Sequence, residues 1–184
     1  MRVSLALSGA FVPTSGQSFV LIDNDGVDAV SGTFAGLAQG ATLVFNGVNL
    51  TIDYSGGDGN DVVLGVVPNP SVSIAVSPAS VLEDGATTLS FTVTRSPSLP
   101  TATTVNISTG GTATSGLDYT GAVATVVILA NATTATITID PTPDSTIEPD
   151  ETVILTVEPG SGYTVGSPSS ATGTIQNDDA DFTV

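Results

Sequence analysis

Acidic residues in the second half of the chain fall where predicted strands end, and not along strand faces. They occur in four stretches, which read VLEDG, GTATSGLDYT, DPTPDSTIEPDET and TIQNDD. In a β-sandwich the loops gather at two poles, so acids from loops that are distant in sequence can meet at one pole. The sequence therefore predicts a cluster of carboxylates at one end of a sandwich.

Such a cluster raises the electrostatic free energy of the folded state. Two unit charges about 4 Å apart repel by about 1 kcal/mol in water and by about 4 kcal/mol at an effective dielectric constant near 20. Calcium offsets this repulsion because it accepts roughly six to eight oxygen ligands, whereas magnesium demands a tighter octahedral shell. The carboxylates are therefore expected to bind Ca²⁺.

The rest of the composition excludes several kinds of catalytic group, metal site and partner. Eighteen acidic residues stand against two basic ones, Arg2 and Arg95, which gives a net charge of -16, and the chain has no Cys and no His. Without a thiol or an imidazole there is no Cys nucleophile, no His base and no soft metal site. The negative charge also disfavours nucleic acid and anionic membrane surfaces as partners.

Paired carboxylates could also serve a glycosidase, whose acid and nucleophile or base are two Asp or Glu residues. Sugar rings usually stack on aromatic side chains, but the chain has no Trp and only three Tyr, namely Tyr54, Tyr119 and Tyr163. No aromatic platform for a sugar is evident. We therefore predict that the chain is not an enzyme.

The elements that must position these acids are β-strands. Val, Ile and Thr are spread through short segments separated by Gly, Pro, Asn and Asp, which is typical of an all-β protein. Alternation is clearest in residues 88–95, where Leu89, Phe91 and Val93 share one face. Seven strands at this spacing predict a seven-stranded sandwich. The expected strands are residues 72–76, 88–95, 103–108, 123–129, 134–139, 152–157 and 171–176.

The first third of the chain has a different texture, with short strands expected at 18–22, 42–45, 48–54 and 61–67 between Gly-rich turns. Two prolines in the segment Val67-Pro68-Asn69-Pro70 predict a stiff linker. We expect a small Gly-rich β module at 1–66, a linker at 67–70, the sandwich at 71–179 and a β-prone tail at 180–184. A module of this size without Cys has a marginal core, so it is expected to lean on the sandwich, an upstream segment or another subunit.

The stretch from about residue 71 to 179 resembles a Calx-β domain, an immunoglobulin-like sandwich, because the four acidic stretches stand in that family's order and spacing. Asn177 stands where the calcium-binding members often have a third consecutive Asp, which implies fewer ions than in the best-equipped relatives. Many members bind calcium weakly or not at all, so solvated surface carboxylates are the alternative. The resemblance implies that the calcium ligands are Glu83, Asp118, Asp144, Glu148, Glu151, Asp178 and Asp179.

Three features of the first third give weaker indications of function. Residues 56–64, GGDGNDVVL, fit the GGxGxDxUx motif of calcium-binding β-rolls. An ion in such a roll is shared between repeats and only one copy is present, so a Gly-rich turn before a strand is the favoured interpretation. Asp23, Asp25 and Asp28 could bind a cation, but Asp-rich turns are usually only turns. Residues 18–64 also resemble the closing segment of β-helical surface proteins of the bacterial autotransporter type.

Three functions remain after these exclusions: a calcium-stabilised extracellular or cell-surface structural or adhesive protein, a self-assembling filament subunit, and an accessory binding module of a larger secreted enzyme. The filament hypothesis rests on the alternation of Val3, Leu5 and Leu7 and on the β-prone tail, since exposed strand edges pair with other strands. Both ends could equally be boundaries inside a longer chain of repeats. No apolar run is long enough for a spanning helix, so we expect no membrane insertion. The expected partners are further copies or neighbouring β modules.

Overall fold

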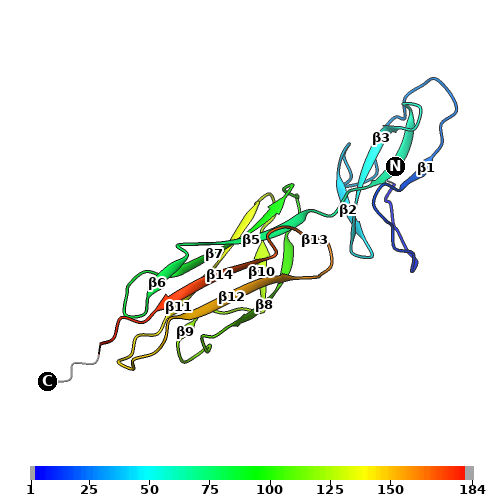
Figure 1. Cartoon of the computed structure of the whole chain (residues 1–184). Helices are drawn as coiled ribbons and strands as arrows, with labels where there is room; N and C mark the ends of the chain where they lie inside the picture. Colours follow the sequence, from blue (N-terminus) through cyan, green and yellow to red (C-terminus); the bar gives the residue numbers. More distant parts are fainter. Residues whose placement is uncertain (1–2, 181–184) are drawn as a thin grey trace. The chain divides into compact units, whose positions relative to one another are not determined.

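The computed structural model describes residues 3–180, which form fourteen β-strands and no helix (Figure 1). The expected all-β class is therefore confirmed. The chain divides into two compact units, residues 1–69 and 70–184. Each unit has its own sheets and its own hydrophobic core. Arg2 and most of the expected C-terminal tail, residues 181–184, lie outside the described residues.

Unit 1, residues 1–69, contains one antiparallel sheet with the strand order β1-β4-β3-β2. A two-residue turn joins β2 to β3, and its residues Asn46 and Gly47 both have positive φ, 47° and 80°. Asn-Gly is the preferred pair for such a hairpin turn, so the local sequence fixes this connection. The strands are β1 (Ser18–Ile22), β2 (Thr42–Phe45), β3 (Val48–Gly56) and β4 (Asp61–Val66).

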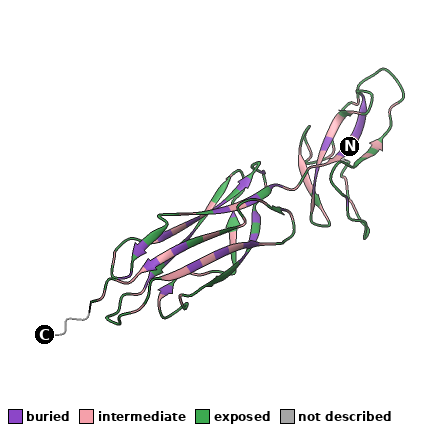
Figure 2. Ribbon diagram, viewed as in Figure 1, coloured by how far each residue is buried: buried purple, intermediate pink, exposed green. Residues whose placement is uncertain are grey.

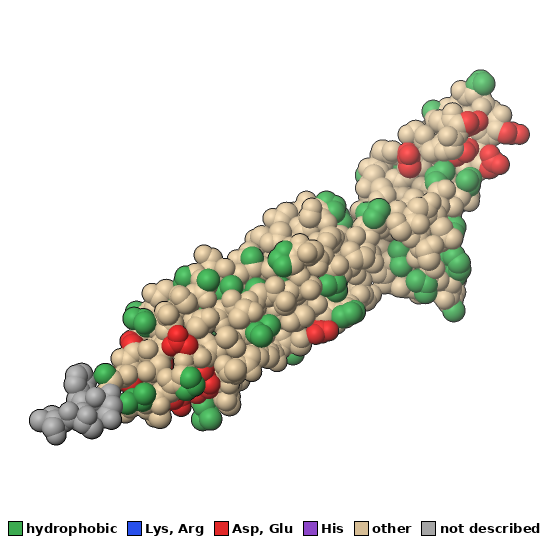
Figure 3. Space-filling view, in the orientation of Figure 1, with side chains coloured by type: hydrophobic (Ala, Val, Ile, Leu, Met, Phe, Trp, Pro, Cys, Tyr) green, Lys and Arg blue, Asp and Glu red, His purple; other side chains and the backbone are tan. Residues whose placement is uncertain are grey.

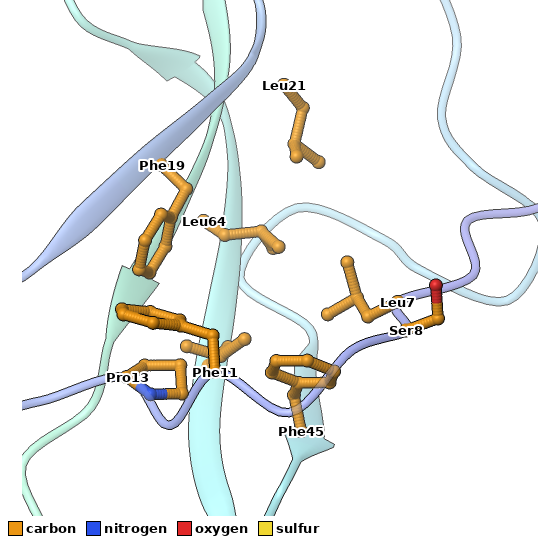
Figure 4. A pocket seen from close by; sticks show the side chains of 9 residues that line it. Leu7, Ser8, Phe11, Pro13, Phe19, Leu21, Phe45 and Leu64 are labelled. Carbon is orange, nitrogen blue, oxygen red and sulfur yellow. The ribbon is translucent and has the colours of Figure 1, made fainter.

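The core of unit 1 is small and partly open. Four hydrophobic side chains are buried, Leu50, Ile52, Val62 and Leu64, and they come from β3 and β4. Beside them lies an apolar groove of about 240 Å³ (Figure 4). Side chains from the N-terminal segment and from β1, β2, β3 and β4 line it, and two of them, Phe11 and Phe19, meet edge to face with ring centroids 5.9 Å apart.

The segment before β1 is not a strand, although its apolar residues alternate. The N–H of Ala35 donates a hydrogen bond of 2.8 Å to the carbonyl of Val3. Leu5 and Leu7 pack against the core of unit 1. Alternation here therefore contributes side chains to the unit's own core.

Unit 2, residues 70–184, is a sandwich of two five-stranded sheets with the orders β10-β8-β12-β14-β6 and β13-β5-β7-β11-β9. Seven of its strands overlap the seven predicted ones. They are β5 (Ser71–Ser77), β7 (Leu89–Ser96), β8 (Thr103–Gly111), β10 (Thr125–Ile128), β11 (Thr134–Pro141), β12 (Glu151–Glu158) and β14 (Ser170–Gln176).

The predicted number of strands was wrong, because residues 70–180 contain ten. The additional strands are β6 (Ser80–Leu82), β9 (Tyr119–Thr120) and β13 (Thr164–Val165), and each is the last strand at one edge of a sheet. Two or three residues are too few to show period-2 alternation. These three short edge strands therefore could not be predicted from the sequence.

The core of unit 2 is formed by alternating side chains from both sheets. Along β7, for example, Leu89, Phe91 and Val93 are fully buried while the residues between them are partly exposed. Figure 2 shows the same alternation of buried and exposed positions along the long strands. Consecutive strands run between the same two ends of the sandwich, so the loops gather at two poles.

Arg95 is a charged residue in the interior of unit 2, with 0% of its surface exposed. Its guanidinium donates to the carbonyls of Leu99, Thr101, Leu129 and Ala132 and to the hydroxyl of Thr103. Burial lowers the pKa of its guanidinium. Arg95 lies at the end of β7, so it belongs to the pole opposite the loop that precedes β7.

Candidate metal centre

The seven predicted ligands all lie at one pole of unit 2. Three connecting segments, before β7, between β8 and β9 and between β11 and β12, supply Glu83, Asp118, Asp144 and Glu148. Glu151 opens β12, and Asp178 with Asp179 follows β14. In Figure 3 acidic side chains gather at this end of unit 2. We call these seven residues the acidic pole.

Three carboxylates form the tightest group at the acidic pole. One oxygen each of Asp118, Glu148 and Glu151 lies within 4.8 Å of the others, and all three side chains are half-buried. The pKa of Glu151 is raised to about 7, first by burial, then by a hydrogen bond shared with Asp118 and by the neighbouring negative charges. The group thus holds more negative charge than it can stabilise alone.

Glu83 links this group to the remaining acids. Only 6% of its surface is exposed. Burial raises the pKa of its carboxyl, and the charges of Asp144, Asp179, Glu148 and Asp84 raise it further. In the same way burial raises the pKa of Asp179, with the charges of Asp84, Asp144 and Asp178 adding to the effect. The structure therefore brings all seven residues into one electrostatic network.

The seven are not equivalent in this network. Asp144 and Asp178 are exposed, whereas the other five are buried or half-buried. Only one group of three meets the 4.8 Å spacing among the described residues. The acidic pole therefore consists of a compact triad around Glu151 and a looser set around Glu83 and Asp179.

Hydrogen bonds that the sequence did not reveal hold the loops of the acidic pole together. The side-chain oxygen of Asn177 accepts from the N–H of Glu148 (3.2 Å), and the N–H of Asn177 donates to Asp150 (3.2 Å). The N–H of Asp84 donates to Asp178 (3.2 Å). Asn177, Asp84 and Asp150 are thus part of the site, although only their membership of the acidic stretches pointed to them.

A hard cation fits this set of donors. Every candidate ligand is a carboxylate, the ligand type that calcium prefers. Glu83 is 6% exposed, and the negative charges of Asp144, Asp179, Glu148 and Asp84 act on its carboxyl. Arg95, the one basic residue in the described part of unit 2, lies at the other pole. Neighbouring carboxylates that are partly removed from water repel one another, so a cation at this pole would stabilise the fold.

The family model of the Calx-beta domain matches residues 68–179. The chain belongs to the Calx-beta domain family. The acidic pole is therefore the pole of a Calx-beta domain, and the family expected from the four acidic stretches is confirmed. The segment before residue 68 lies outside this match.

Solved Calx structures are similar to the Calx-beta domain of this chain. The apo form of the Calx CBD1 domain shares 24% identity with a TM-score of 0.49, over 59% of this chain and 98% of that one. CBD12 from CALX1.2 and the calcium binding domain CBD12 of CALX1.1 each share 24% identity with a TM-score of 0.49, over 58% of this chain. This chain spans 44% of the length of each of these two. No curated protein matches the chain.

Proposed function

We propose that the chain is a non-enzymatic, extracellular structural or adhesive protein whose acidic pole binds calcium. The observation that carries this proposal is the buried carboxylate of Glu83, which lies among other carboxylates. A folded protein that assembles such a group gains from a cation that neutralises it. Calcium is the ion whose oxygen preference and flexible coordination suit this arrangement.

Two sets of residues would hold calcium. Asp118, Glu148 and Glu151 form the first, and the second consists of Glu83, Asp144, Asp178 and Asp179. Bound calcium would supply positive charge and would tie four separate segments of the sandwich to one another. The sandwich would then be stiffest where three of its loops and its last strand meet.

The absence of catalysis is supported by the aromatic residues of unit 2. Tyr119 is 2% exposed and Tyr163 is 4% exposed, and neither can offer a ring face to a sugar. A glycosidase would need such a surface beside its carboxylates. The acidic pole is therefore better suited to metal binding than to glycoside hydrolysis.

An extracellular location is supported by the kind of site. Extracellular calcium modules bind at about 10⁻⁴ to 10⁻³ M, an affinity that the ion concentration outside cells satisfies. Residues 3–180 contain no helix long and apolar enough to cross a bilayer. The proposed setting is a bacterial cell surface or matrix, where a chain of β modules carries load.

We further propose that the chain joins further copies or neighbouring β modules through edge strands, as a filament subunit would. In unit 1 both edge strands expose apolar side chains, with Val20 and Ile22 of β1 and Val44 of β2 each more than 40% exposed. Exposed edges are ready to pair with other strands.

Calcium binding is tested by the melting temperature of the full chain in CaCl₂ and in a chelator. At about 1 mM calcium and a dissociation constant of about 0.1 mM, the stabilisation is about 1.4 kcal/mol, which shifts the melting temperature of unit 2 by about 6 °C. The double variant Glu148→Gln/Glu151→Gln, which removes two of the three ligands of the first set, should reduce the shift. Glu158→Gln, at the other end of β12, should keep it. An equal melting temperature in both buffers would reject the site.

Assembly is tested separately by sedimentation velocity over a range of protein concentrations and by electron microscopy. Polymers or fibrils that grow with concentration and dissolve on chelation are expected. A monomer at every concentration, with or without calcium, would reject the filament while leaving the calcium site intact.

A further inference from the structure

Unit 1 holds a second set of oxygen atoms, contributed by two loops that meet. The first loop, residues 23–28, follows β1, and the second, residues 57–60 with Asp61, joins β3 to β4. The N–H of Asn24 donates to Oδ1 of Asp61 (2.9 Å), and Nδ2 of Asn60 donates to the carbonyl of Gly26 (2.7 Å). Figure 3 shows acidic side chains gathered at one end of this unit.

The carboxylate of Asp61 is buried at this meeting point, with 7% of its residue exposed. Its Oδ2 lies against Gly57, where an added Cβ would come within 1.8 Å of it. Gly57 also has a positive φ of 59°, so the turn both needs glycine and makes room for the carboxylate. Residues 3–69 contain no Lys, Arg or His, so no basic side chain of described unit 1 neutralises Asp61.

Asn60 supplies the observation that points to a ligand. It is 9% exposed, and its Oδ1 is buried without a hydrogen-bond partner among the described residues. Its Nδ2, on the same carbon as Oδ1, contacts the first loop, which places Oδ1 at the junction of the two loops. A buried acceptor without a donor is costly, and a cation beside it would remove that cost.

The first loop brings further oxygens to the same place. A Cβ on Gly26 would lie 2.8 Å from Oδ1 of Asp28 and 3.5 Å from Oδ1 of Asn24. The carbonyl of Gly26 is the group that Asn60 contacts. The first loop thus offers side-chain oxygens of Asn24 and Asp28 and the carbonyl of Gly26, and the second offers those of Asn60 and Asp61. Carboxylate, amide and backbone carbonyl oxygens are the donor chemistry of a calcium site.

We propose that these two loops form a second calcium site, in which Asp61 and Asn60 are the central ligands and Asn24, Gly26 and Asp28 complete the shell. The lone GGxGxDxUx motif lacks the neighbouring repeat that would share its ion. Here residues 23–28 take the place of that repeat. The proposal is independent of the acidic pole, because no residue is common to the two sites.

The test follows calcium binding residue by residue in the full chain. In the Glu148→Gln/Glu151→Gln background, ¹H–¹⁵N NMR spectra are recorded during titration with CaCl₂ and, for comparison, MgCl₂. Calcium should shift the amide signals of residues 23–28 and 57–61 with a dissociation constant of about 10⁻⁴ to 10⁻³ M, and magnesium should bind more weakly. Asp61→Asn should weaken calcium binding at least about tenfold.

Asp58→Asn is the matched control, because Asp58 is an exposed acid of the same turn and should leave the affinity unchanged. If Asp61→Asn does not fold, Asp28→Asn decides, since Asp28 is an exposed ligand of the proposed shell and its loss should weaken calcium binding about threefold or more. Unchanged amide signals at residues 23–28 and 57–61 in 10 mM calcium would overturn the proposal. Equal losses of calcium affinity in Asp58→Asn and Asp61→Asn would also overturn it.

Discussion

At the scale of single residues, the carboxylates of the acidic pole repel one another. Burial, the adjacent carboxyl of Asp118 and the other negative charges nearby raise the pKa of Glu151 to about 7. A carboxyl with this pKa is partly protonated near neutral pH. Near neutral pH the metal-free pole therefore holds protons that an isolated Glu or Asp would have lost. Protons and calcium compete for the same oxygens.

The stability of the metal-free protein should therefore rise as the pH falls from about 8 to about 5. The pKa of Glu151 is raised from 4.5 to about 7 on folding, so protonation favours the folded state. This stabilisation is complete below the unfolded pKa and is lost as the pH rises through the folded one. The raised pKa values of Glu83 and Asp179 act in the same direction. Melting temperatures of metal-free protein at both pH values measure the effect.

Two controls accompany this pH series. Glu151→Gln should flatten the dependence, and saturating calcium should reduce or reverse it. The lowered pKa of Asp53 changes stability only as the pH falls below its usual 3.8, outside this window. A metal-free melting temperature that is constant between pH 5 and 8 would contradict the prediction.

Arg95 should be required for the stability of unit 2 but not for calcium binding. Its guanidinium reaches four carbonyls and one hydroxyl, and a Lys at this position has one nitrogen where Arg has three. Arg95→Lys should therefore lower the free energy of unfolding by about 2 kcal/mol or more, as measured by urea denaturation. The calcium affinity should stay the same, because Arg95 lies at the opposite pole. A large loss of calcium binding in folded Arg95→Lys would show that the poles are coupled.

At the scale of elements, the loops of the acidic pole are joined before any ion binds. Asn177, just after β14, accepts from the N–H of Glu148 and donates through Nδ2 to the carbonyl of Asp179 (3.1 Å). It therefore fixes two loop segments that carry candidate ligands. An amide at this position performs the task without adding another negative charge.

Asn177→Asp should consequently have opposite effects with and without calcium. The carboxylate keeps the acceptor for Glu148 but loses the donor to Asp179 and adds repulsion, so the melting temperature in chelator should fall by a few degrees. With a further carboxylate at the pole, calcium affinity should rise several-fold. Isothermal titration calorimetry measures the affinity. A variant that is as stable as the wild type in chelator, or that binds calcium more weakly, would contradict this role.

Some of these elements could be predicted from the sequence and others could not. The seven long strands were predictable because apolar residues alternate along them, and the gathering of acids followed from the loops between those strands. The edge strands β6, β9 and β13 were not, because two or three residues carry no period. The burial of Glu83 and the links made by Asn177 depend on backbone groups from other loops. The sequence around Glu83 and Asn177 does not indicate which groups of distant loops they contact.

At the scale of the whole molecule, the chain joins two units with very different cores. Seventeen hydrophobic side chains are buried in the core of unit 2, whereas four are buried in that of unit 1. Buried apolar area is the main source of stability, so unit 1 should be the weaker unit. We propose that residues 67–70 separate two cooperative units.

Unfolding should therefore proceed in two steps, with unit 1 first. Ile52→Ala should lower the free energy of unfolding of unit 1, and Phe91→Ala should lower that of unit 2. Each loss should be about 3 kcal/mol or more, because both side chains are fully buried. Hydrogen exchange followed by mass spectrometry in increasing urea reports the two units separately. Glu148→Gln/Glu151→Gln should reduce the calcium protection of unit 2 alone, since its two positions lie in that unit. If Ile52→Ala and Phe91→Ala each destabilised residues 3–69 and 70–180 equally, the chain would unfold as one cooperative unit. Calcium bound at the acidic pole would then stabilise unit 1 as well.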